Sequence, residues 1–193
     1  MTGSRSDGKK AVAYISGPLQ AAVDLSEARA LYERLATTCR ECGWDPYLPH
    51  QRTDPIHHAE ASAKAVFDRD LSAVSSADLI VAYVGAPSSG VGAELGIAFE
   101  RGIPVVGVCG PEGVASRFIE GLLETGTEAR LIYFRDDADC RRQLTEVLSA
   151  LRRRGEEAPA SEVASHGVCA VGFDVLRDVD GTPHEVTAGR GRR

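Results

Sequence analysis

Short apolar runs alternate with longer amphipathic segments along most of the chain. The runs are rich in β-branched residues and are bounded by Gly, Pro or charged residues, which is typical of buried strands. Five strands are predicted in this way, at Lys10–Ser16, Trp44–Leu48, Asp78–Val84, Ile103–Cys109 and Ala129–Phe134.

The amphipathic segments between these runs predict helices. Asp24 and Ser26 are both suited to cap the first helix, and Gly43 is a natural stop after its last turn. Helices are expected from Asp24 or Ser26 to Glu41, over His57–Ser76, from Val91 onward, over Val114–Leu123 and over Asp136–Arg153. In the second of these helices, the residues expected to face inward are Ala61, Ala65, Leu71 and Val74.

Strands that alternate with helices predict an α/β fold. We expect a doubly wound, Rossmann-like sheet of five parallel strands with helices on both faces, formed by residues 11–153 as one domain. Residues 1–10 are expected to be a disordered N-terminus, and residues 154–193 a linker and C-terminal tail. The Asp-Gly step within Val179–Thr182 leaves two alternatives open there, an ordered hairpin or a loose tail.

Composition narrows the choice of partners and compartment. The net charge of −6 argues against nucleic acid as a main partner, because binding a phosphate backbone needs a basic face. No apolar run approaches the roughly 18 residues that span a bilayer, and we expect no membrane contact and a cytoplasmic location. Five cysteines, an odd set, fit a reducing compartment. For the C-x-x-C of Cys39 and Cys42, small helix residues are the favoured interpretation and a zinc or redox site the alternative.

One carboxylate follows the most distinctive segment of the chain. The strand Asp78–Val84 leads into a loop of Gly, Pro and Ser at 85–92, and the spacing of Val91 and Leu95 predicts that Glu94 lies in the first turn of a helix. The helix dipole favours a negative charge there, so we expect Glu94 to stay ionised and ready to attack. Strand, glycine loop and helix are also the layout of an anion-binding site, since open α/β sheets bind ligands beyond the carboxyl ends of their strands.

Four motifs in register connect this layout to a known family. They are Tyr14-Ile15-Ser16-Gly17-Pro18-Leu19, Tyr47-Leu48-Pro49-His50, Asp70-Leu71 ahead of Ala77-Asp78, and Gly90-Val91-Gly92-Ala93-Glu94-Leu95-Gly96. With them the chain resembles, over residues 11–150 or so, the nucleoside 2-deoxyribosyltransferase superfamily, which includes nucleoside 5'-monophosphate N-glycosidases. The resemblance implies a nucleotide or nucleoside substrate, no metal or organic cofactor, and a homodimer in which a neighbouring subunit often completes the pocket.

The resemblance also implies three catalytic roles. Glu94 would be the nucleophile that attacks the anomeric carbon, Asp70 the carboxyl group that handles the proton on the base or on water, and Tyr14 the hydroxyl that orients the nucleophile. Physical reasoning supports this division, because a glycosyl-cation-like transition state needs an adjacent anion and a base leaves poorly without a proton. Two carboxyl groups in one pocket also push their pKa values apart. Each of the three residues also has a purely structural alternative. Glu94 would only complement the helix dipole, Asp70 would be a solvent-exposed helix residue, and Tyr14 would be a buried residue of the sheet.

Ser88 indicates the class of substrate. In the family's transferases the matching position tends to be acidic, whereas the monophosphate hydrolases carry a serine that helps to hold phosphate. A carboxylate would repel phosphate, so Ser88 beside a helix N-terminus favours a 5'-monophosphate, although a turn serine explains it too. The expected substrate-binding residues are Gly17, Pro18, His50, Arg52, Ser88, Gly90 and Gly92.

One departure from the family pattern concerns the phosphate. Its hydrolases usually carry an arginine shortly after the first-strand glycine, where this chain has Pro18, Leu19 and Gln20. The charge of a phosphate must then be met by another side chain. The candidates are His50, Arg52 and Arg69.

Other functions stay open from the sequence. Within the family, the alternatives are hydrolysis of a nucleotide and base exchange on a free nucleoside, and a non-catalytic nucleotide sensor could use the same fold. A dinucleotide-binding domain is disfavoured, because Gly90-x-Gly92-x-x-x-Gly96 is not G-x-G-x-x-G and follows the third strand. Cytokinin-type phosphoribohydrolases carry a P-G-G-x-G-T-x-x-E loop, which PSSGVGAE does not match.

Overall fold

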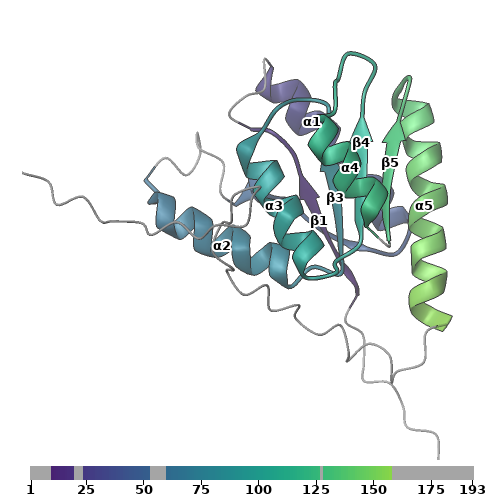
Figure 1. Ribbon diagram of the computed structural model, residues 1–193, viewed down its shortest axis with the longest axis horizontal. Coiled ribbons are helices and arrows are strands. Elements are labelled where there is room, and N and C mark those ends of the chain that lie inside the picture. The colour runs from purple at the N-terminus through teal and green to yellow at the C-terminus, as the bar shows by residue number, and fades with distance from the viewer. Residues whose placement is uncertain (1–9, 20–23, 53–59, 127, 158–193) are drawn as a thin grey trace, which may run out of the picture.

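The predicted strands form one parallel sheet. A computed structural model of the chain describes residues 10–19, 24–52, 60–126 and 128–157. Its five strands lie in the order β2-β1-β3-β4-β5, and every neighbouring pair is parallel (Figure 1). In chain order the elements are β1 (Val12–Ser16), α1 (Leu25–Glu41), β2 (Asp45–Tyr47), the 3-10 helix η1 (Pro49–Gln51), α2 (Ala63–Ser75), β3 (Leu79–Tyr83), α3 (Ser89–Glu100), β4 (Val105–Cys109), α4 (Arg117–Thr125), β5 (Ala129–Tyr133) and α5 (Asp137–Glu157).

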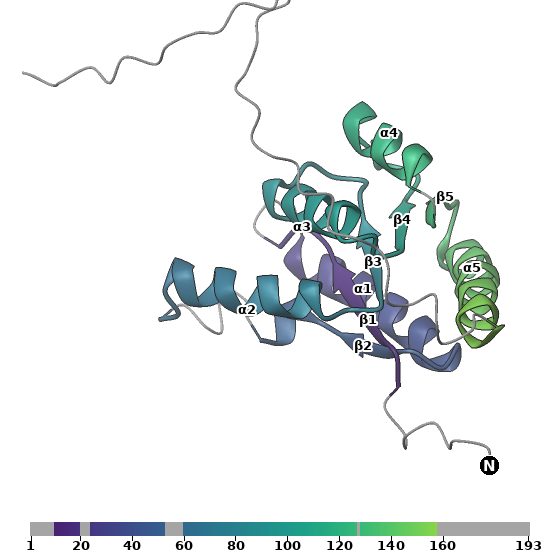
Figure 2. The ribbon, with the colours of Figure 1, turned by 60° about the horizontal axis from the view of Figure 1, so that its bottom comes forward.

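Side-chain alternation along the strands divides the core into two layers. On β1, Ala13 and Ile15 pack into the layer covered by α1 and α5, and Tyr14 belongs to the layer on the opposite face. Helices α2, α3 and α4 cover that second face (Figure 2). The predicted fold class, a doubly wound α/β sheet with helices on both faces, is confirmed.

The strand order places the topological switch point of the sheet at the carboxyl end of β1. This strand pairs with both β2 and β3, while the chain leaves β1 toward the α1 face and leaves β3 toward the α3 face. The two connections diverge between β1 and β3, which is the topological switch point where open α/β sheets bind ligands. Functional side chains are therefore expected at the ends of β1 and β3.

The first helix follows the sequence signals closely. The side chain of Asp24 accepts hydrogen bonds from the backbone N–H groups of Ser26, at 2.8 Å, and Glu27, at 3.1 Å. The helix ends at Glu41, and Gly43 adopts a φ of 84°, in the left-handed region that glycine tolerates best. Both expected boundaries of α1 are confirmed.

Several boundaries differ from the expectation. Helix α2 places only Val74 fully inside, and Ala65, expected to face inward, is exposed. Strand β2 is shorter than predicted, and α5 continues to Glu157, so residues 154–157 are helical rather than linker. Several predictions concern segments outside the described residues. These segments are residues 1–9, the start of the second predicted helix at His57, and the linker, hairpin and tail beyond residue 157. Across the described ranges, no helix is both long and apolar enough to cross a membrane.

Candidate active site

Glu94 is held by two hydroxyl groups of β1. The Tyr14 hydroxyl donates a hydrogen bond to Oε1 of Glu94 at 2.7 Å, and the Ser16 hydroxyl donates one to Oε2 at 2.5 Å. Tyr14 and Ser16 are two residues apart on one strand, so both side chains point to the face that α3 covers. Both are buried, which removes water as a competing partner for the carboxylate.

The position of Glu94 in its helix differs from the prediction. Ser88 caps α3, so Ser89 and Gly90 belong to the first turn, which carries no acidic residue, and Glu94 lies in the second turn. The expectation of a first-turn carboxylate was therefore wrong. The reason is that Ser89, Gly90 and Gly92 are helical, although Gly and Ser typically favour loops. The helix dipole acts mainly on the first turn, so it does not account for the charge of Glu94.

Burial and hydrogen bonding set the ionisation of Glu94. Burial raises the pKa of its carboxyl group, the hydrogen bonds from Ser16 and Tyr14 oppose that rise, and the negative charge of Asp70 adds to it. The pKa of Tyr14 is raised far above its usual value, chiefly by burial and then by Glu94, so the phenol stays protonated and remains a donor. Hydrogen bonds, not the dipole, are what favour the ionised form of this carboxyl group.

Asp70 on α2 belongs to the same constellation. Its side chain is half-buried, and its charge raises the pKa values of Glu94, Tyr14 and Tyr47, in each case after the larger effect of burial. The ring of Tyr47, at the end of β2, stacks on the ring of Tyr14 with centroids 5.6 Å apart. The structure thus brings together the three residues that the sequence named as catalytic, Glu94, Asp70 and Tyr14.

The N-terminal end of α3 is open beside this group. Ser88 accepts a hydrogen bond from the backbone N–H of Val91 at 3.3 Å, which is the role of a helix cap. A Cβ added at Gly90 would have only the Ser88 hydroxyl within 4 Å, at 3.8 Å, and one added at Gly92 would have no neighbour within that distance. The glycines leave space over the helix end, and Gly90 lies one turn before Glu94 on the same helix face.

Comparison with known proteins places this site in a family. The model of the family described as nucleoside 2-deoxyribosyltransferase matches residues 13–120, more than half of the chain and all the residues just described. The chain belongs to this family.

Individual relatives agree with that assignment. A Methanosarcina mazei protein named "Putative 2'-deoxynucleoside 5'-phosphate N-hydrolase 1" is 29% identical over 126 residues, 64% of this chain and 75% of that protein. The 5-hydroxymethyl-dUMP N-hydrolase of Rattus norvegicus is 32% identical over 100 residues, 49% of this chain and 61% of that protein. The solved structure of the Clostridium botulinum CMP N-glycosidase BcmB superposes with a TM-score of 0.52 at 22% identity, covering 69% of this chain and 96% of that one. That last likeness concerns the fold.

In this nucleoside 2-deoxyribosyltransferase family member, the turn after β1 is fixed by Tyr32. A Cβ at Gly17 would lie 2.3 Å from the Tyr32 ring, and the Tyr32 hydroxyl donates to the carbonyl oxygen of Pro18 at 2.7 Å. Gly17 therefore has a packing reason to be glycine, beside the close approach of a ligand that the sequence suggested. The contact holds the turn against α1, next to the switch point.

The candidate cations lie in different surroundings. His50 is buried beside Tyr32, and its Nε2 lies 3.0 Å from a carboxylate oxygen of Glu33. The exposed guanidinium of Arg52 lies over the Tyr47 ring, 5.9 Å from its centroid, and Arg69 donates to the backbone oxygen of Arg52 at 2.6 Å. Arg52 contacts Tyr47, which stacks on Tyr14 beside Glu94, and Arg69 contacts Arg52, so both arginines lie near the candidate active site. His50 instead contacts Glu33 of α1.

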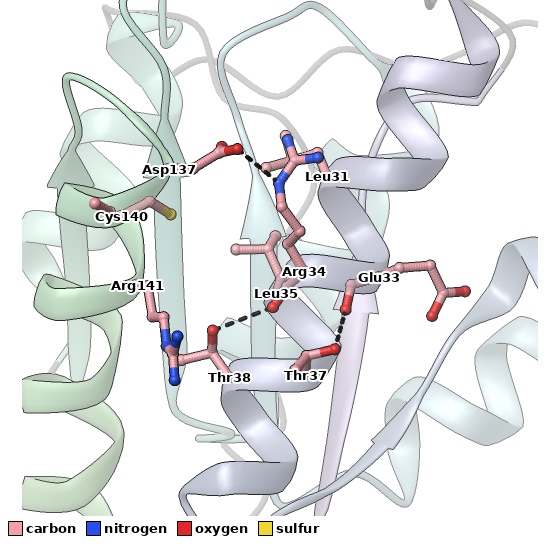
Figure 3. A pocket seen from close by; sticks show the side chains of 10 residues that line it. Leu31, Glu33, Arg34, Leu35, Thr37, Thr38, Asp137, Cys140 and Arg141 are labelled. Atoms are coloured by element: carbon pink, nitrogen blue, oxygen red, sulfur yellow. Dashed lines mark hydrogen bonds and ion pairs between the residues drawn. The ribbon is translucent and has the colours of Figure 1, made fainter.

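A pocket lies on the other face of the sheet. It has a volume of about 420 Å³ between α1 and α5, and an ion pair between Arg34 and Asp137 at 3.1 Å joins the two helices there (Figure 3). None of the residues expected in the active site lines it. No group of three or more His, Cys, Asp or Glu side chains suited to a metal occurs among the described residues.

Two residues of the site were missed by the sequence reasoning. Ser16 and Tyr47 stand inside the quoted motifs, but neither had been given a role. Strand periodicity could have found Ser16, because a residue two positions after Tyr14 shares its face. Tyr47 could not be found in that way, since its contact with Tyr14 depends on the pairing of β1 with β2.

Proposed function

We propose that this chain hydrolyses the N-glycosidic bond of a nucleoside 5'-monophosphate, ribo or deoxyribo, through a covalent glycosyl-Glu94 intermediate. The observation that carries the proposal is the half-buried carboxylate of Glu94, held by hydroxyl donors from β1 and within electrostatic range of Asp70. The names of the Methanosarcina mazei and rat relatives, both N-hydrolases of nucleoside 5'-phosphates, support the same reaction.

The two carboxyl groups divide the first half of the reaction. An oxygen of Glu94 forms a bond to C1' of the sugar while the bond from C1' to the base nitrogen breaks, and its electron pair goes to that nitrogen. Asp70, in its protonated form, supplies the proton that lets the base leave as a neutral molecule. Tyr14 keeps the nucleophile oriented and, being neutral, adds no charge.

The second half returns both groups to their starting state. The carboxylate of Asp70 takes a proton from water, whose oxygen bonds to C1' as the ester bond to Glu94 breaks and its electron pair returns to the carboxylate. The products are the free base and a sugar 5-phosphate. Double displacement predicts that the configuration at C1' is retained.

The phosphate would lie at the N-terminal end of α3. Ser88 and the backbone around Gly90 offer hydrogen-bond donors there, and no carboxylate takes the place of Ser88 to repel an anion. Gly17 and Pro18 at the β1 turn and Gly92 on α3 would complete the substrate-binding surface. Arg52 and Arg69 are the cations best placed to approach it, and His50, whose ring lies beside Tyr32, would act through the β1 turn that Tyr32 holds.

The test is release of free base from a panel of nucleosides and nucleoside 5'-monophosphates. We expect release from monophosphates by the wild type, with a loss of about a thousandfold or more in Glu94→Ala. Glu100→Ala, an exposed carboxylate on the same helix, serves as the matched control. No release by the wild type, or equal release by Glu94→Ala, would leave a nucleotide sensor as the function.

A second base in the assay separates hydrolysis from transfer. The transferase alternative uses the same Glu94 and Asp70 and is specifically favoured by the family model that the chain matches. Formation of a new nucleoside at the expense of free sugar would establish it. Formation of sugar phosphate whatever the added base supports the hydrolase.

We also propose that the protein is a cytoplasmic homodimer. The face of the sheet that carries α2, α3 and α4 exposes three large apolar side chains, Phe67, Phe99 and Phe118, with exposed fractions of 59%, 45% and 79%. A second copy of the chain seated on this face would cover these side chains. The four described cysteines are free thiols, as in a reducing compartment. Light scattering should give twice the chain mass for the wild type and the single mass for Phe118→Asp.

A further inference from the structure

Both oxygens of the Glu94 carboxylate are occupied on the protein side. The Tyr14 donor fixes Oε1 and the Ser16 donor fixes Oε2, and Ser16 is only 1% exposed. The bond from Ser16, at 2.5 Å, lies in the range of charge-assisted hydrogen bonds from hydroxyl groups to carboxylates. Among the described residues, no cation forms an ion pair with Glu94.

We propose that Ser16 is a positioning residue for the Glu94 nucleophile, holding Oε2 so that the carboxylate keeps one orientation and its negative charge. This role deepens the proposed function and rests on it. A single donor would leave the carboxyl group free to rotate about its last torsion, whereas two donors on the two oxygens fix the plane of the group. Each oxygen keeps a second lone pair for the sugar.

Because burial raises the pKa of Glu94, the groups that face this carboxyl group decide whether it stays ionised, and Ser16 is the first of those that lower its pKa. From β1 Tyr14 contributes a neutral phenol, from β2 Tyr47 stacks behind it, and from α2 Asp70 contributes a carboxyl group that disfavours the ionisation of Glu94 whenever it is itself charged. The same layer receives Ile80 and Ala82 from β3 and Val105 and Cys109 from β4, and the pKa of the Cys109 thiol is raised, chiefly by burial, so it is neutral near pH 7.

The hydrogen bonds, from Ser16 first and then from Tyr14, are what lower the pKa of Glu94 against its burial. Hydrogen bonding to the ionised form always favours that form.

The same donor acts differently on the two halves of the reaction. A hydroxyl donates more strongly to a carboxylate than to a neutral ester. Ser16 therefore stabilises Glu94 before attack and stabilises it again as the ester bond breaks and the electron pair returns to the carboxylate. Loss of Ser16 should slow the hydrolysis of the glycosyl-enzyme more than its formation, so the adduct accumulates.

The test compares Ser16→Ala with Ser16→Thr, which keeps the hydroxyl. In Ser16→Ala we expect the acid limb of the pH profile of kcat/KM to move to higher pH, with about a tenfold loss on that limb and a smaller loss on the plateau. Ser16→Thr should restore the profile. Ser75→Ala is the matched control, because the buried Ser75 hydroxyl has no hydrogen-bond partner among the described residues.

A direct titration keeps this proposal separate from the proposed function. The carboxyl carbon of Glu94, labelled with ¹³C and assigned with Glu94→Gln, can be titrated by NMR whether or not the protein releases a base. A higher pKa of Glu94 in Ser16→Ala, with no change in Ser75→Ala, supports the role of Ser16. An unchanged pKa in a folded Ser16→Ala variant would overturn it, even if the wild type proves to be an active hydrolase.

Discussion

The two faces of the sheet are built for different purposes. On the α1 and α5 face, large apolar side chains form a core beside a pocket of about 420 Å³, where Arg34 of α1 pairs with Asp137 of α5. On the α2 and α3 face, the buried hydroxyl groups of Tyr14 and Ser16 donate hydrogen bonds to the half-buried carboxylate of Glu94. The comparison teaches that mutually oriented polar groups, and not pocket volume, distinguish the candidate active site from the rest of the molecule.

After the loss of Glu94, the largest expected effect is the loss of the second carboxyl group, Asp70. Asp70→Asn cannot deliver a proton to the base or take one from water, and we expect kcat to fall by about a hundredfold to ten-thousandfold. Asp68→Asn, an exposed neighbour on α2 that pairs with Lys64, is the control and should keep its activity. Equal kcat values for the two variants, measured by base release, would remove Asp70 from the mechanism.

Substitutions on the α1 and α5 face should change the stability of the protein and not its activity. Leu144→Ala truncates a fully buried side chain between α5 and α1, and we expect a loss of about 2–5 kcal/mol in the free energy of unfolding, measured with urea. Activity per folded molecule should persist. Arg34→Ala, which breaks the ion pair across the cavity, should leave kcat/KM unchanged. A collapse of activity in folded Arg34→Ala would mean that the cavity takes part in function.

Removing the charge of Glu94 should stabilise the protein while inactivating it. Burial raises the pKa of Glu94 in the folded state above its unfolded value, so the stability that this group contributes is present below the unfolded pKa and is lost as pH rises through the folded pKa. Glu94→Gln escapes that loss. Its Tm should exceed that of the wild type near pH 7, by about a few degrees, and by less near pH 4. A lower Tm than wild type near pH 7 would contradict this sign.

The smallest effect concerns the open end of α3. Gly90→Ala places a methyl group in free space one turn before Glu94, and should add about 0.5–1 kcal/mol of stability while raising KM for a monophosphate. Gly96→Ala, also in open space on α3, should stabilise the fold with KM unchanged. If both variants keep the wild-type KM, the substrate does not lie over Gly90.

The sequence predicted the layered fold because local patterns determine it. The apolar runs of β1, β3 and β4 and the caps of α1 suffice to order the elements, and parallel pairing follows from their alternation with helices. The start of α3 was not predictable from propensity, because Ser89 and Gly90 become helical only when Ser88 caps them and Val91 and Leu95 pack on the sheet. Tertiary packing overrides weak propensity at such positions.

The candidate site was only partly predictable for a similar reason. Glu94, Asp70 and Tyr14 stand in motifs that can be recognised from sequence, and the structure brings them together. The partners of the cations could not be read from sequence, because the contact of His50 with Glu33 and that of Arg52 with Tyr47 depend on how η1 folds back on α1 and β2. The ionisation of Glu94 was attributed to the helix dipole, although hydrogen bonds from a strand far away in sequence favour its charge.

The configuration of the product at C1' tests the central claim most directly. In buffer containing methanol, the glycosyl-enzyme should be intercepted to give a stable methyl glycoside 5-phosphate, whose anomer NMR identifies. Attack by Glu94 followed by attack of methanol requires two inversions, so we expect the β anomer from a β nucleotide. The α anomer would mean that the acceptor attacks the sugar directly and that Glu94 is not the nucleophile.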